Sequence, residues 1–117
     1  MPFSWGDNVF TEKKLARQAV NDTGETIYTV PADTKTIVKD IHICNNSGTD
    51  CYVTLWLVPN GDSPTDENVM FYQWNVPAND FVHWNGWQVL DTAGDTIQAL
   101  AETSDQITIM VSGAEIT

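Results

Sequence analysis

Two histidines and two cysteines are the side chains in this sequence best suited to nucleophilic or metal chemistry. His42 and Cys44 lie two positions apart in an alternating apolar run, so a strand would place both on one face. A Cys–His pair needs the two groups within hydrogen-bonding distance, whereas positions i and i+2 of a strand are about 7 Å apart. We therefore expect no catalytic pair and no enzyme activity.

Metal binding would need a different grouping of ligands. Zinc takes about four ligands at short, characteristic spacings, and His42, His83, Cys44 and Cys51 have no such spacing. Oxygen ligands suited to calcium gather in residues 60–68, but their order does not match an EF-hand loop. A solvated acidic loop explains that segment better. We predict no metal and no other cofactor.

The tryptophans offer binding rather than catalysis. Trp84 and Trp87 flank an Asn-Gly pair that predicts a tight turn, and exposed indoles beside amides are suited to stacking on sugar rings. Tryptophan is also enriched in cores and subunit interfaces. Trp56 lies on the face of its predicted strand opposite Val53 and Leu55, which makes both faces of that strand apolar. We favour an interface and keep a carbohydrate-binding module using Trp84 and Trp87 as the alternative.

The charge is distributed very unevenly along the chain. All five basic residues lie before residue 40, where five acids balance them, and the remaining 78 residues carry eleven acids with no Lys or Arg. The whole formal charge of −11 therefore lies in that later part. Such a body cannot neutralise phosphates, so we expect no nucleic-acid partner and no anionic membrane partner. The basic segment near the N-terminus is suited to lie on an acidic body, its own or a neighbour's.

Residues 1–24 are predicted to form an N-terminal arm or outer strand, followed by a β-sandwich domain at residues 25–117. Residues 11–20 contain good helix formers, yet they also fit an outer strand paired with residues 26–30, and we favour the strand. The arm carries aromatic side chains that need a surface to cover. The candidate interface residues are Phe3, Trp5, Phe10, Lys13, Lys14, Arg17 and Trp56.

The rest of the chain consists of short runs rich in Val, Ile, Thr and aromatics, separated by Pro, Gly and Asx turns. The predicted strands are residues 26–30, 35–44, 51–58, 69–74, 80–85, 87–90, 96–101 and 106–112. Strands that recur about every ten residues with turns between them favour an antiparallel arrangement. The expected fold is all-β, an antiparallel β-sandwich or jelly-roll-like fold of about eight strands with an N-terminal arm.

Two positions test this strand assignment. Alternation places Lys39 on the same face as the isoleucines of its strand, which requires either a β-bulge or a lysine stem that reaches an edge. Cys44 and Cys51 flank a predicted hairpin loop, and alternation points Cys51 inward and Cys44 outward. A disulfide needs both side chains to point the same way, so we expect two free thiols.

Several motifs resemble a pattern found in small tailed-phage structural proteins. The run TIYTVPA at residues 26–32 leads into IVKDIHICN at residues 37–45 and then VTLWLVP at residues 53–59. The segments VPAN (76–79), AGDTI (93–97) and VSGAEI (111–116) continue the likeness, which covers about residues 25–117. The chain departs from the pattern at Asp33, where glycine is usual, and in its tryptophans.

The resemblance implies a virion component, such as a capsid decoration protein or a neck or tail-fibre module. It implies partners that are copies of the chain itself, in a homo-oligomer such as a trimer, and other virion proteins. The N-terminus has no basic region followed by an apolar run, so we expect synthesis in the host cytoplasm without a secretory signal.

Overall fold

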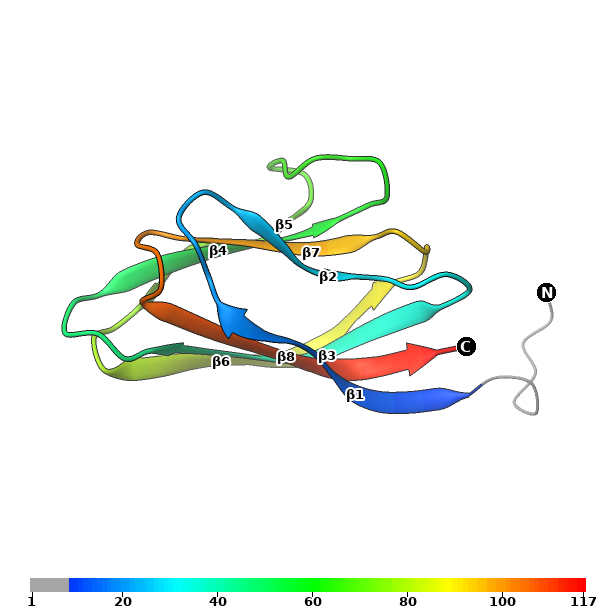
Figure 1. Ribbon diagram of the computed structural model, residues 1–117, viewed down its shortest axis with the longest axis horizontal. Helices are drawn as coiled ribbons and strands as arrows, with labels where there is room; N and C mark the ends of the chain where they lie inside the picture. Colours follow the sequence, from blue (N-terminus) through cyan, green and yellow to red (C-terminus); the bar gives the residue numbers. More distant parts are fainter. Residues whose placement is uncertain (1–8) are drawn as a thin grey trace.

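The computed structural model describes residues 9–117, and these residues form eight β-strands and no helix. Figure 1 shows the strands as two layers. The strands are β1 (Phe10–Ala19), β2 (Glu25–Thr29), β3 (Lys35–Asn45), β4 (Cys51–Val58), β5 (Val69–Val76), β6 (Asp80–Leu90), β7 (Thr96–Ala101) and β8 (Ile107–Ile116). The described part of the chain has no helix long and apolar enough to cross a membrane.

The strands form two four-stranded antiparallel sheets. Sheet 1 has the order β1-β8-β3-β6 and sheet 2 has the order β2-β7-β4-β5. Among the described strands, only β4 and β5 are neighbours both in the sequence and in a sheet, so every other connection crosses between the layers. Eight strands wound in this order form a jelly roll. The predicted fold class is confirmed.

The core lies between the two sheets because each inner strand alternates apolar inward and polar outward residues. In sheet 1, Ile41 and Ile43 of β3 and Ile109 of β8 are fully buried, and in sheet 2 Leu55 and Ile97 face them. Each such side chain contributes about 1.5–3 kcal/mol relative to an exposed position. The period of two in the sequence is therefore the direct cause of the two-layer core.

Three local expectations are wrong. The segment at residues 11–20 is a strand, as favoured, but its partner is β8 and not β2. The connection from β3 to β4 crosses between the sheets and is not a hairpin loop. The Asn-Gly pair at residues 85–86 makes no turn, because β6 runs without interruption through it. Backbone pairing with β3 continues on both sides of the pair, with a register shift in place of a turn.

The shift belongs to a line of irregularities that crosses sheet 1. Register changes between Lys14 and Ala16 in β1, and between Val38 and Asp40 in β3. At the same level, a Cβ added to Gly113 of β8 would lie 1.9 Å from the carbonyl oxygen of Ile37, so only glycine allows the two backbones to approach this closely. Of the two alternatives for Lys39, a β-bulge or a stem that reaches an edge, the structure has the bulge, and it turns this lysine outward.

Both cysteine predictions are confirmed. Cys51 is fully buried, Cys44 is half-buried, and both are free thiols. They lie in different sheets, Cys44 in β3 and Cys51 in β4.

A polar cluster links the layers at one end of the sandwich. The Tyr28 hydroxyl of β2 donates to Glu115 Oε2 of β8 at 2.5 Å, and the Thr36 hydroxyl lies 2.7 Å from the same phenolic oxygen. The Lys13 ammonium closes the cluster with a 3.2 Å ion pair to Glu115 Oε1. Because the single phenolic proton goes to the carboxylate, Thr36 donates to Tyr28.

Candidate functional site

The outer face of sheet 1, which points away from sheet 2, collects the exposed apolar side chains of the molecule. Six large hydrophobic residues are exposed in the described chain, and four of them lie on this face: Phe10, Phe81, Trp87 and Val89. Folded monomers seldom expose a large contiguous apolar patch that has no role. This face is therefore the first candidate for function.

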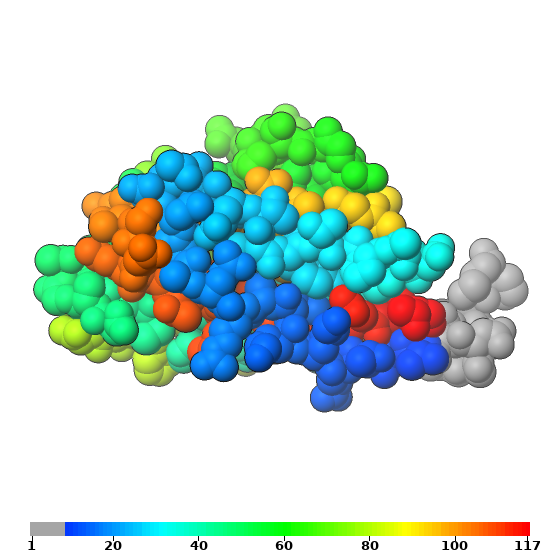
Figure 2. All heavy atoms as spheres, viewed as in Figure 1, coloured from blue at the N-terminus to red at the C-terminus, as the bar shows by residue number. Residues whose placement is uncertain are grey.

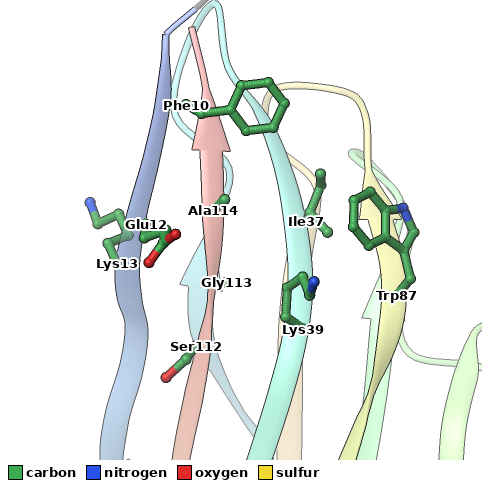
Figure 3. Close-up of a pocket in the computed structure, with 9 residues that line it drawn as sticks. All are labelled: Phe10, Glu12, Lys13, Ile37, Lys39, Trp87, Ser112, Gly113 and Ala114. Atoms are coloured by element: carbon green, nitrogen blue, oxygen red, sulfur yellow. The ribbon is translucent and has the colours of Figure 1, made fainter.

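A groove of about 600 Å³ lies on this face, and we call it the outer groove. Figure 3 shows Phe10 of β1 and Trp87 of β6 extending towards Ile37 of β3, which lies between those strands. Ile37 is only 5% exposed although it lies outside the main core, whereas Phe10 is 47% and Trp87 59% exposed. Ala114 forms part of the floor. The groove therefore has an apolar floor and two partly exposed aromatic walls.

The bulge at Lys39 shapes one wall of the groove. By turning Lys39 outward it brings the ammonium group to 4.8 Å from the centroid of the Trp87 ring. A cation over an indole at this distance is attracted by the ring quadrupole, by about 0.5–1 kcal/mol at an exposed site. The contact holds a positive charge beside the aromatic wall.

Charge is segregated between the two layers. The strands of sheet 1 contain all five basic residues and four acids, namely Glu12, Asp40, Asp80 and Glu115. The strands of sheet 2 and the loops between residues 20 and 106 contain eleven acids and no basic residue. Two of the sheet 1 acids have side-chain partners of their own, since Glu115 pairs with the Lys13 ammonium and Asp40 Oδ2 lies 2.7 Å from His83 Nε2. The molecule is therefore strongly polarised, with sheet 1 as its basic side.

The histidines lie on the same outer face, further along the strands. His83 Nε2 lies 2.7 Å from Asp40 Oδ2, and the His42 ring stacks on Phe81 with centroids 4.9 Å apart. The two imidazole rings are 6.1 Å apart. His42 thus packs as an aromatic side chain. Within residues 9–117, no group of three or more His, Cys, Asp or Glu side chains is arranged to hold a metal ion.

The two residues of the predicted sugar site lie on opposite faces of β6. Trp84 pairs with Ile41 and packs against the core, while Trp87 lies on the outer face in the groove. The sequence pattern suggested a turn that would bring both indoles together, but the strand with a bulge separates them. The two side chains therefore do not form one binding surface.

The predicted interface residues divide into three groups. Phe10 forms a wall of the groove, and Lys14 and Arg17 lie nearby on the exposed side of β1. Lys13 also lines the groove, and its ammonium pairs with Glu115. Trp56 is half-buried in sheet 2, away from this face. Phe3 and Trp5 lie outside the described residues.

Two apolar residues of this face, Ile37 in the groove and Val89 outside its lining, were not predicted. They pair with each other on the outer face, although their apolar side chains would predict positions in the core. Lys39 was the available signal. A charged residue in phase with isoleucines indicated a bulge, and a bulge reverses which residues face outward.

Comparison with known proteins shows the fold. No protein-family model and no curated protein sequence matches the chain. A chain of the Bacillus endospore appendages, described as a family of disulfide-linked pili, has a TM-score of 0.59 and 14% identity over 100% of this chain and 96% of that one.

Two viral structures are also similar. A chain of the giant freshwater prawn Macrobrachium rosenbergii extra small virus VLP has a TM-score of 0.50 and 9% identity, over 99% of this chain and 82% of that one. A chain of infectious bursal disease virus, Gx strain, has a TM-score of 0.51 and 11% identity over 94% of this chain, which spans only 32% of the viral chain. These proteins therefore share the fold of this chain.

Proposed function

We propose that this protein is a non-enzymatic structural subunit of a virion, which associates with copies of itself and docks on a capsid or tail through the outer face of sheet 1. The observation that carries the proposal is the outer groove, with exposed Phe10 and Trp87 over a covered floor of Ile37 and Ala114. Aromatic anchors at the centre of a patch dominate the energy of most protein interfaces.

Two further observations support this function. The fold occurs in chains of assembled particles, namely the extra small virus VLP and the endospore pili. The motifs at residues 26–45 and 53–59 resemble those of tailed-phage structural proteins, which favours a capsid decoration protein or a neck or tail component.

The experiment compares assembly of the wild-type chain with that of a groove variant, Phe10→Ser with Trp87→Ser, by light scattering over a range of concentrations. The wild type is expected to exceed the 13.0 kDa mass of one chain, increasingly with concentration. The groove variant is expected to remain a monomer. Tyr72→Ser removes an even more exposed aromatic from β5 in sheet 2 and should assemble as the wild type does.

Two results would contradict the proposal. One is a wild-type chain that stays monomeric at the highest concentration, and the other is a groove variant that assembles normally. A glycan that binds the monomer and is lost in Trp87→Ser would instead support a sugar-binding surface built on this one indole.

A further inference from the structure

We infer that the outer groove receives the acidic loop (residues 59–68) of a second copy, so that copies join head to tail. The inference rests on the proposed function and names the partner surface that this function leaves open.

Charge complementarity identifies the second copy's loop as the occupant. Lys39 lines the groove together with one carboxylate, Glu12, and Lys35 lies beside it in the row of Phe10 and Ile116 on the same face. The two lysines outnumber this one acid. The acidic loop carries three exposed carboxylates and no basic residue: Asp62, Asp66 and Glu67. Opposite charges brought into contact are screened little, because salt screens over about 8 Å at physiological strength. The basic face and the acidic loop are therefore mutually attractive even though the whole chain is acidic.

The loop also carries an apolar group suited to aromatic walls. Pro64 is exposed and lies two residues from both Asp62 and Asp66. Proline rings of Pro-rich segments dock in aromatic-lined grooves, and the exposed ring of Pro64 offers the same kind of apolar surface. The order carboxylate–proline–carboxylate thus matches a groove in which the Phe10 and Trp87 rings are accompanied by lysines.

The loop is held in one shape before it binds. The Asn68 side chain accepts from the Thr65 amide at 3.0 Å and donates to the Ser63 carbonyl oxygen at 3.0 Å. The Asn60 amide anchors the start of the loop to Asp95 at 2.9 Å. A preorganised loop loses less conformational entropy on docking.

The two surfaces lie on opposite sides of the molecule. Figures 1 and 2 show the acidic loop above sheet 2 in green, while β1 of sheet 1 runs along the lower side in blue. Neither surface can therefore satisfy the other within one chain. A contact between different surfaces of identical chains is heterologous, so it extends to a ring or an open filament and not to a closed dimer.

The decisive experiment exchanges the charges. A face variant carries Lys35→Glu and Lys39→Glu, and a loop variant carries Asp62→Lys and Asp66→Lys. Each alone is expected to associate at least about tenfold more weakly than the wild type, because like charges then meet across the contact. An equimolar mixture of the two variants is expected to associate as the wild type does, in assemblies that alternate the two variants, because each groove then meets a loop of opposite charge on the other variant.

A matched loop control carries Asp22→Lys and Glu102→Lys. These exposed acids lie in loops 20–24 and 102–106, away from the acidic loop, and their replacement makes the same change in net charge. The control should associate at least as well as the wild type. Circular dichroism of all variants should show the same sheet content.

The outcomes separate this inference from the proposed function. If the face variant loses association while the loop variant keeps it, the groove still assembles but its occupant is another surface, and the inference fails alone. If mixing the two variants restores nothing, the inference also fails. If the groove variant Phe10→Ser with Trp87→Ser associates normally, the proposed function itself fails.

Discussion

The Lys39 ammonium lies 4.8 Å from the centroid of the Trp87 ring, across two neighbouring strands that are both bulged at this level. Three residues before Trp87 on the same strand, the Trp84 ring packs against the core on the other side of the sheet. The bulge therefore assigns one indole to the surface and the other to the interior, and it makes their roles experimentally separable.

Replacing the two tryptophans should separate assembly from stability. Trp87→Ala removes a side chain that is 59% exposed, so the free energy of unfolding should fall by less than about 1 kcal/mol while association is lost. Trp84→Ala should lower the free energy of unfolding by about 2–4 kcal/mol, because it leaves a cavity against the core. Urea denaturation and light scattering of both variants measure the two effects. Equal loss of stability in both would contradict this assignment.

Gly113→Ala should destabilise the protein by about 3 kcal/mol, because strands β8 and β3 would have to separate to admit the new methyl group. The added carbon would otherwise lie 1.9 Å from the Ile37 carbonyl oxygen. Gly48→Ala is the matched control, since a Cβ there meets nothing within 4 Å. Denaturant unfolding of the two variants provides the comparison, and a neutral Gly113→Ala would refute the close approach.

The polar cluster at Glu115 should make stability depend on pH. The Tyr28 hydroxyl, assisted by Lys13, holds the pKa of the Glu115 carboxyl below its usual value against the opposing effect of burial. The folded state therefore binds the proton less tightly than the unfolded state does. This contribution is present above the ordinary glutamate pKa and is lost as the pH falls through the lower, folded value.

Comparison of the wild type with Glu115→Gln isolates this effect, because all other carboxyl groups titrate in both proteins. The free energy of unfolding of the wild type should exceed that of the variant at neutral pH, and the difference should shrink as the pH falls below the ordinary glutamate pKa. A difference that stays constant over this range would show that Glu115 titrates normally.

Tyr28 should make the free energy of unfolding depend on pH in the alkaline range, where stability falls as the pH rises. Burial, with the nearby Glu115, raises the pKa of Tyr28 above its usual value. Its contribution is therefore complete below the ordinary tyrosine pKa and is lost as the pH rises further. Tyr28→Phe should remove this alkaline dependence and cost about 1–3 kcal/mol at neutral pH through the lost hydrogen bonds. An unchanged alkaline profile in Tyr28→Phe would contradict this role.

The two thiols should react at very different rates. Cys51 is fully buried and Cys44 half-buried, so a maleimide should label Cys44 in the native protein and both residues only after unfolding. Mass spectrometry counts the labels directly. Cys44→Ser should abolish native labelling, and rapid labelling of that variant would place Cys51 at the surface.

Most strands could be predicted from the sequence because alternation is local. Residues such as Ile41, Ile43, Ile107 and Ile109 repeat with a period of two, and that period alone predicts a strand with one buried face. The pairing of strands within the sheets could not be predicted in the same way. Pairing of β1 with β8 joins opposite ends of the chain, and nothing within either segment specifies the other.

The outer groove could not be predicted from the sequence either, because it too depends on contacts between distant strands. A single added residue reverses the face of every side chain beyond it, so the position of Trp87 relative to Trp84 depends on a bulge whose partners lie in other strands. Lys39 signalled the bulge within its own strand. It could not show that β6 would be bulged at the same level and bring an indole beneath the ammonium.

The distribution of charge separates most clearly what the sequence determined from what the tertiary structure decided. The amino-acid sequence by itself determined that every cation precedes residue 40 and that the remainder is purely acidic, since these are properties of composition and order. The tertiary structure decided that the cations share one side of the molecule. Strands β1 and β3, which contain them, both lie in sheet 1, while the intervening β2 lies in sheet 2 and has no basic residue. A sidedness of charge arises only when strands distant in the chain are brought into one layer.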